Sequence, residues 1–136
     1  MAKEIKTARF GPAGRRTTQL IVGDSADIDS TMSGRTINQD FAGGTLQLPT
    51  IDESNIGMNF TFRNTAADAA GDLIIAPAAT DGINGTIGEV SASGVVNKNW
   101  SLTLSSSVKG DWCKLVAVAV GEWYITGGVG VWASEA

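Results

Sequence analysis

Residues 109–132 read KGDWCKLVAVAVGEWYITGGVGVW, and this stretch indicates the fold class of the whole chain. Within positions 112–120 every residue except Lys114 is apolar, and β-branched side chains are frequent. Apolar side chains occupy both alternating sets of positions, so we expect a strand that is covered on both faces and lies centrally in a sandwich or barrel. Glycine-containing turns at 121–122 and 127–128 then predict a β-meander.

The remaining sequence predicts more short strands. Met58, Phe60 and Phe62 alternate with polar residues in 57–64, which predicts a half-buried antiparallel strand with these three side chains in the core. Other predicted strands lie at 17–22, 34–40 (an edge strand), 45–48, 72–76, 87–90 and 100–104, with turns at 81–86 and a polar loop at 91–99. A length of 136 residues with 17 glycines suits one domain. We therefore predict an all-β, single-domain, antiparallel β-sandwich of jelly-roll type or a small barrel.

Charge divides the chain into two parts. Residues 1–16 contain five basic residues and one acidic residue, a net charge of +4, whereas residues 17–136 contain five basic and thirteen acidic residues, a net charge of −8. This predicts an extended basic N-terminal arm (1–16) that reaches for an acidic partner surface, attached to a β-rich domain (17–136). A solvated terminus without a partner is the alternative. An acidic domain argues against nucleic acid as a partner.

The sequence offers little for catalysis or cofactor binding. It has no histidine, and Cys113 is the single cysteine, which we expect to be a reduced, buried, small apolar residue. The acidic run 24–29, within GDSADIDS (23–30), does not match a calcium loop and predicts a polar turn instead of a metal site. Asp52 and Glu53 are adjacent, which favours solvated loop charge over paired acid–base catalysis. We expect no enzyme activity, no cofactor and no metal.

The hydropathy of the sequence indicates where in the cell the chain is expected. No run of 18 apolar residues is present, so we expect no membrane span. The N-terminus lacks the apolar core of a secretory signal, so the chain is expected to be soluble and made in the cytoplasm.

Several motifs occur in a recognisable order: GTLQLP (44–49), NIGMNFTFRN (55–64), DLIIAP (72–77), DGINGT (81–86) and the stretch 109–132. This order, covering about residues 17–132, resembles a module of tailed-phage virion proteins, notably small capsid decoration (cement) proteins and parts of tail fibres. The resemblance implies a β-rich fold, symmetric assembly as a homotrimer and a place on the virion. It carries no active-site residues.

Two functional hypotheses follow. In the first, the chain is a decoration protein made in the host cytoplasm that stabilises the outer capsid surface by docking on the major capsid protein. Its docking residues would be Lys3, Lys6, Arg9, Phe10, Arg15 and Arg16. Tyr124 and Trp132 are candidates for contacts between protomers, or else for the core.

The second hypothesis is a receptor- or glycan-binding domain of a tail fibre or spike. Trp100 with Asn97 and Asn99 would supply the aromatic and carboxamide groups that glycans bind. A chain that starts at Met1 without a long shaft or anchor favours the first hypothesis.

Overall fold

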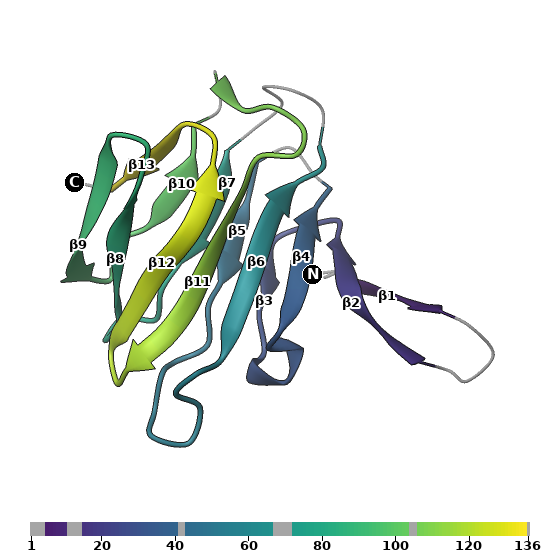
Figure 1. The fold of residues 1–136 in the computed structure, drawn as a ribbon, viewed down its shortest axis with the longest axis horizontal. Coiled ribbons are helices and arrows are strands. Elements are labelled where there is room, and N and C mark those ends of the chain that lie inside the picture. Colours follow the sequence, from purple (N-terminus) through teal and green to yellow (C-terminus); the bar gives the residue numbers. More distant parts are fainter. Residues whose placement is uncertain (1–4, 11–14, 41–42, 67–71, 104–105, 136) are drawn as a thin grey trace.

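A computed structural model describes residues 5–10, 15–40, 43–66, 72–103 and 106–135, with residues 5–10 and 15–18 described by their backbone alone. In this part of the chain, thirteen strands and one short 3-10 helix form two sheets that pack face to face (Figure 1). The expected all-β sandwich is confirmed. The described residues include no helix long and apolar enough to cross a membrane.

The large sheet has eight strands in the spatial order β1-β2-β4-β6-β11-β12-β8-β9. Their bounds are β1 Ile5–Phe10, β2 Arg15–Val22, β4 Arg35–Gln39, β6 Asn59–Asn64, β8 Gly82–Ile87, β9 Val90–Val96, β11 Trp112–Ala119 and β12 Glu122–Val129. The small sheet has five strands in the order β13-β10-β7-β5-β3. Their bounds are β3 Ala26–Asp27, β5 Thr45–Gln47, β7 Leu73–Ala76, β10 Trp100–Leu102 and β13 Trp132–Ser134. The 3-10 helix η1 covers Ser30–Met32, between β3 and β4.

Both sheets are mixed, which corrects the expectation of a purely antiparallel sandwich. In the large sheet β4 runs parallel to β2 and to β6, and β8 runs parallel to β12. In the small sheet β5 runs parallel to β3 and to β7. From β2 to β8 the chain alternates between the sheets, so each strand is separated from its sheet neighbour by a crossover. Crossover connections allow parallel pairing, which a tight hairpin does not.

The core lies between the two sheets and is rich in aromatic side chains. Phe60 and Phe62 of β6 are fully buried and Met58 nearly so, as their alternation predicted. Trp100 of β10 stacks on Trp132 of β13, with ring centroids 5.8 Å apart and planes 4° apart. Both rings are at most 1% exposed. These side chains anchor the small sheet against the inner face of the large one.

The strand β11 is central in the large sheet, between β6 and β12, as expected. The expectation that both of its faces are covered is wrong. Cys113, Leu115 and Ala117 are buried, whereas Val118 on the other face is 50% exposed. The small sheet covers one face only, and β-branched residues such as Val116 suit a solvent-facing strand because of their β propensity.

The C-terminal strands do not form a meander. β12 continues through Gly127 and Gly128 to Val129, and β13 then crosses to the small sheet, where it pairs with β10. A Cβ at Gly128 would overlap Ile87 Cδ1 and lie 2.9 Å from the Trp112 carbonyl oxygen. Glycine is therefore required here for close packing within a continuous strand, and the predicted break is wrong.

Residues 81–99 also differ from the expectation of turns, a strand at 87–90 and a polar loop. They form the β8–β9 hairpin at one edge of the large sheet, and the turn lies between Ile87 and Val90. Gly85 has φ of 134°, and a Cβ there would lie 2.7 Å from Ile125 Cβ. Gly82 and Gly85, which looked like turn signals, are thus strand residues, with Gly82 close to Gly94 of β9 and Gly85 close to Ile125 of β12.

The other side of the large sheet ends in the β1–β2 hairpin. β4, expected to be an edge strand, lies inside the sheet because β2 pairs beside it and β1 adds a further strand. β2 begins at Arg15 rather than at residue 17, and β1 lies within the region expected to be an extended arm. The hairpin projects sideways beyond the sandwich (Figure 1). The N-terminal extension therefore includes a two-stranded ribbon.

Candidate functional site

Cys113 is the first candidate for chemistry, and it is fully buried and free, as expected. Burial raises the pKa of the Cys113 thiol far above its ordinary range, because the thiolate would lose its hydration. A thiol that is protonated and shielded from solvent is not a competent nucleophile. Cys113 therefore acts as a packing residue.

Asp24 and Asp29 of the 24–29 run serve local turns, as the sequence predicted, whereas Asp27 lies in β3. Asp24 Oδ1 accepts a hydrogen bond from the Ser25 backbone N–H at 2.7 Å. Asp29 caps η1 by accepting from the Thr31 N–H at 2.9 Å, and this backbone hydrogen bond lowers the pKa of Asp29 below its ordinary value. Within the described ranges no three His, Cys, Asp or Glu side chains gather in a way that could hold a metal ion.

Two further acidic residues also have structural partners. The Ser54 hydroxyl and backbone N–H both donate to Asp52 Oδ1, and the hydroxyl is the larger cause of the lowered pKa of Asp52. Asp81 is buried, and its Oδ2 accepts from the Ile51 N–H at 3.0 Å. These carboxylates fix the loops between strands.

Three residues expected on binding surfaces can now be placed. Trp132 is 1% exposed and belongs to the core, which is one of the two roles considered for it. Trp100 is fully buried, so it cannot form a glycan site with Asn97 and Asn99. Tyr124 lies on the outer face of the large sheet and is 39% exposed. Its hydroxyl donates to Glu122 Oε1 at 3.2 Å, which raises the pKa of Tyr124.

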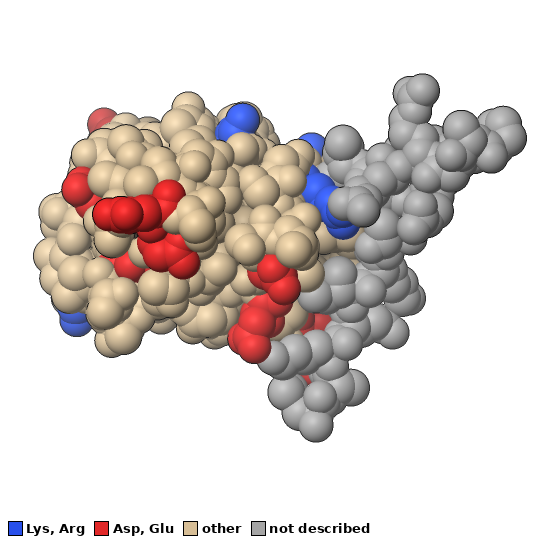
Figure 2. All heavy atoms as spheres, turned by 90° about the horizontal axis from the view of Figure 1, so that it is seen from below, with Lys and Arg blue, Asp and Glu red and all other residues tan. Residues whose placement is uncertain are grey.

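The basic residues of the N-terminus lie on the β1–β2 hairpin, apart from Lys3, which is outside the described residues. Arg9 of β1 is the register partner of Arg16 of β2, and Phe10 is the partner of Arg15. Lys6 pairs with Ile21, nearer the sandwich. The backbone register thus concentrates three arginines at the end of the hairpin that lies farthest from the sandwich. Figure 2 shows that the charged side chains visible on the lower face of the body are mostly acidic.

A second candidate is the outer face of the large sheet, which no described strand covers. Strand register places outward-facing residues in rows across β2, β4, β6, β11 and β12. One row contains Ile21, Asn38, Arg63, Trp112 and Val129. The next contains Gln19, Thr36, Thr61, Lys114 and Gly127. This face therefore combines amides, hydroxyls, cations and one indole ring.

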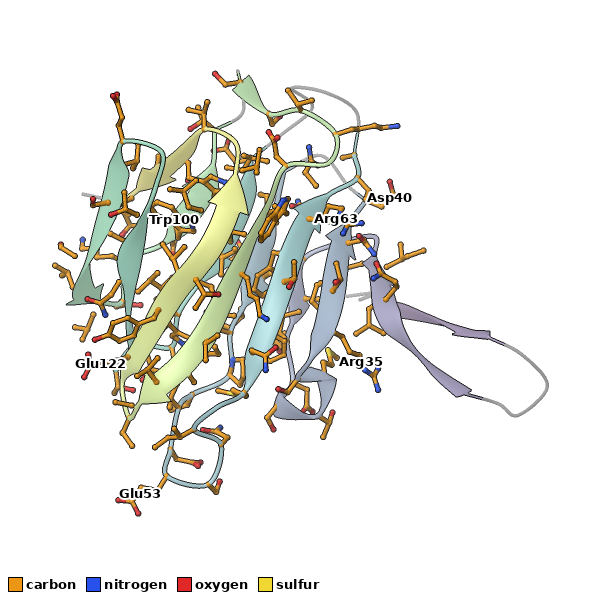
Figure 3. The ribbon with its side chains drawn as sticks, in the orientation of Figure 1. Arg35, Asp40, Glu53, Arg63, Trp100 and Glu122 are labelled. Carbon is orange, nitrogen blue, oxygen red and sulfur yellow. The ribbon has the colours of Figure 1, made fainter. Side chains whose placement is uncertain are left out.

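A hollow of about 330 Å³ lies at one end of this face. Among the described residues it is lined by Gln19, Ile21, Asn38, Asp40, Arg63 and Thr65. Figure 3 shows Asp40 and Arg63 at the same end of the large sheet, although no hydrogen bond or ion pair joins them. The hollow thus presents a carboxylate and a guanidinium close together.

Asn38 is the buried polar residue of the hollow, with 8% of its surface exposed. Its Nδ2 donates to Gln19 Oε1 at 2.9 Å and to the Leu20 carbonyl oxygen at 3.2 Å. Its Oδ1 has no hydrogen-bond partner in the structure. This oxygen is itself inaccessible to solvent, so it is an unsatisfied buried acceptor that costs about 1–3 kcal/mol of stability.

Comparison with known proteins adds no assignment. No protein-family model matches the chain, and no curated protein matches it.

The sequence did not predict the hollow, because its lining residues come from β2, β4, β6 and the segments that follow them. Nothing in a sequence of alternating strands shows that β2 and β6 flank β4.

Proposed function

We propose that this chain is a non-enzymatic structural protein of a phage virion, which decorates and stabilises the outer surface of the capsid. The observation that supports the proposal best is the β1–β2 hairpin, a projecting ribbon whose far end combines Arg9, Arg15 and Arg16. The body behind it is acidic, with thirteen acidic and five basic residues in 17–136. A basic projection on an acidic body favours one orientation towards an acidic partner.

The strand register of the hairpin brings together groups that an acidic partner could bind. Arg9 and Arg16 are register partners, and Arg15 precedes Arg16 in the same strand. An acidic surface, in this proposal a carboxylate-rich patch of the major capsid protein, would form charge-assisted hydrogen bonds with the guanidinium groups of these three arginines. Phe10, the partner of Arg15, adds an apolar group to the docking segment.

Binding to the assembled shell would then stabilise it by mass action. A protein that binds the shell but not its dissociated subunits contributes RT ln(1 + [L]/Kd), about 2.7 kcal/mol at a hundredfold excess over Kd. A homotrimer would present three hairpins at once and gain through effective concentration. Tyr124, on the exposed outer face, stays the candidate residue for contacts between protomers.

The test is a matched pair of charge variants. Arg9, Arg15 and Arg16 are replaced together by Gln in the first variant, and Arg35, Lys98 and Lys109 in the second, so both lose three positive charges. We expect the hairpin variant to lose at least tenfold in binding to phage heads stripped of the protein, with a weaker salt dependence, while the body variant binds normally. Co-sedimentation with heads measures binding, and circular dichroism checks folding.

Two results would refute the proposal. One is normal decoration by the hairpin variant, which would remove the role of the hairpin. The other is absence of the protein from regular lattice positions on purified particles. The alternative of a tail-fibre receptor domain predicts a fibre-tip location in the same particles.

A further inference from the structure

We infer that the Asn84–Gly85 pair of β8 is a site of deamidation, which the closed β8–β9 hairpin protects and which opening of this hairpin exposes. Asn84 is the one asparagine of the sequence that glycine follows. It lies in the DGINGT motif (81–86), to which the proposed function assigns no role. The inference is independent of the capsid proposal, because β8 and β9 lie at the opposite edge of the large sheet from the β1–β2 hairpin.

The reaction needs only the chain itself and water. The Gly85 backbone nitrogen attacks Cγ of the Asn84 side chain, and the new C–N bond closes a five-membered succinimide ring. The proton of the Gly85 amide passes to the side-chain nitrogen, which leaves as ammonia. Water then opens the ring at one of its two carbonyl carbons, which leaves either aspartate or isoaspartate. Glycine favours the attack, because it has no Cβ to shield its nitrogen.

The packing of β8 requires glycine at position 85. Gly85 has φ of 134°, and a Cβ there would lie 2.7 Å from Ile125 Cβ of β12. A larger residue, which would slow the reaction, therefore cannot take its place without displacing β12. The reactive pair is thus a consequence of how β8 packs in the sheet, and Asn84 itself is half-buried.

The geometry of the closed hairpin opposes the attack. Asn84 lies in an extended strand between Tyr124 of β12 and Ser93 of β9, its register partners. Extended residues have ψ of about +115° to +135°, which directs the nitrogen of the next residue away from the side chain. The Asn84 Nδ2 also donates to the Trp123 carbonyl oxygen at 3.4 Å, which holds the side chain towards β12. Pairing with both strands must break before the backbone at Asn84 can turn.

The β8–β9 hairpin is joined to the rest of the large sheet by one short ladder. β8 pairs with β12 in parallel over three residue pairs, whereas β12 pairs with β11 along most of its length. β9 forms the edge of the sheet, and β8 is its only neighbour there among the described strands (Figure 1). Ile83 and Ile87 are buried, so the closed state dominates. Segments held by few contacts nevertheless open at a lower free energy than the whole domain unfolds.

Deamidation would make the hairpin harder to close. The new carboxylate at position 84 would lie beside Tyr124, whose hydroxyl already donates to Glu122, so a second negative charge would join this part of the sheet. Isoaspartate adds one carbon to the backbone of β8, which moves the residues after position 84 out of register with β9. The modified chain is therefore expected to have a frayed edge at β8–β9.

The experiment incubates the full 136-residue protein at mildly alkaline pH, either native or unfolded in urea, and locates deamidation by peptide mass spectrometry. We expect Asn84 to react at least tenfold more slowly in the native protein than in urea. Asn97 is the control within the chain, because it is exposed but precedes Lys98. It is expected to stay intact under both conditions over the same time.

Two variants separate opening of the hairpin from unfolding of the domain. A Cβ at Gly82 would overlap the Gly94 carbonyl oxygen of β9, so Gly82→Ala destabilises the closed hairpin. It is expected to raise the native rate at Asn84 about tenfold. Leu115→Ala weakens the core of the closed and of the opened state alike, so it is expected to leave this rate unchanged.

Hydrogen exchange of the wild type makes the same comparison without a substitution, and the amides of β8 and β9 are expected to exchange faster than those of β6 and β11. The inference is overturned if Asn84 reacts as fast in the native protein as in urea, or does not react in urea. Equal acceleration by Gly82→Ala and Leu115→Ala would also overturn it, as would β8 amides that exchange no faster than those of β11. None of these results affects capsid binding by the β1–β2 hairpin.

Discussion

The two faces of β11 carry similar residues in opposite environments. On the inner face Leu115 is fully buried between Phe60 of β6 and Ile125 of β12, its register partners. On the outer face Val118 is 50% exposed. Both are aliphatic and lie three positions apart in one strand, so the difference comes from the small sheet, which covers one side of the large sheet.

This difference shows what an apolar pattern can and cannot predict. The transfer of a side chain out of water stabilises a fold only where another layer supplies contacts. On an uncovered face the same β-branched residue contributes through strand propensity and neighbouring cross-strand contacts, which are worth less. An exposed side chain on this face is also available to a partner, as Tyr124 is in the proposed function.

The largest effect is expected from truncating the inner face. Leu115→Ala removes a fully buried side chain and leaves a cavity, so the free energy of unfolding is expected to fall by about 2–5 kcal/mol. Val118→Ala, on the outer face, is expected to change it by no more than about 0.5 kcal/mol. Urea denaturation followed by tryptophan fluorescence measures both. Equal losses in the two variants would show that the outer face is also covered.

A smaller effect is expected from two adjacent glycines of β12. A Cβ at Gly128 meets Ile87 and the Trp112 backbone on the inner side, whereas a Cβ at Gly127 meets only the Trp112 ring, at 3.3 Å. Overpacking of this kind costs about 1–3 kcal/mol, so Gly128→Ala is expected to be destabilising by that amount. Gly127→Ala is expected to cost less, because the indole can move into solvent. The reverse order in thermal denaturation would contradict the assignment of the two faces.

The smallest expected effect is on the pH dependence of stability, through Asp29, which caps η1 and lies on neither face of β11. The pKa of Asp29 is lowered by the hydrogen bond from the Thr31 backbone N–H. A lowered folded-state pKa gives stability that is present above the unfolded pKa of about 3.9 and is lost as pH falls through the folded value. Asp29→Asn keeps a capping side chain but does not titrate. We therefore expect the Tm difference between wild type and this variant to be constant above about pH 5 and to shift against the wild type at lower pH. A pH-independent difference would contradict this linkage.

Much of the fold could be predicted from local patterns. The alternation of Met58, Phe60 and Phe62 identified a strand and its buried face, and the apolar setting of Cys113 identified a buried thiol. The predictions failed at 81–99, where Gly82 and Gly85 were interpreted as turn residues. Their need for glycine arises from contacts with β9 and β12, which are distant in sequence.

The two candidate sites, the basic hairpin and the hollow, also differ in how far the sequence could predict them. The excess of basic residues before position 17 could be read directly from the sequence, because charge is a property of composition. The hollow could not be predicted, since Asn38 and Arg63 are 25 positions apart and become neighbours only through the parallel pairing of β4 and β6. Trp100 and Leu102 are buried, as the alternation of 100–104 predicted, and this burial excludes Trp100 from the glycan site of the alternative hypothesis.

The sequence by itself determined an all-β chain, a basic N-terminal segment on an acidic body, and a core built from alternating apolar residues, because strand propensity, charge and period are local properties. The tertiary structure decided which face of each strand is buried, which strands run parallel, and which polar groups meet around Asn38. The physical reason is that burial and hydrogen-bond satisfaction depend on neighbours brought together by crossovers between the sheets, and a strand pattern of period two is compatible with several orders of strands.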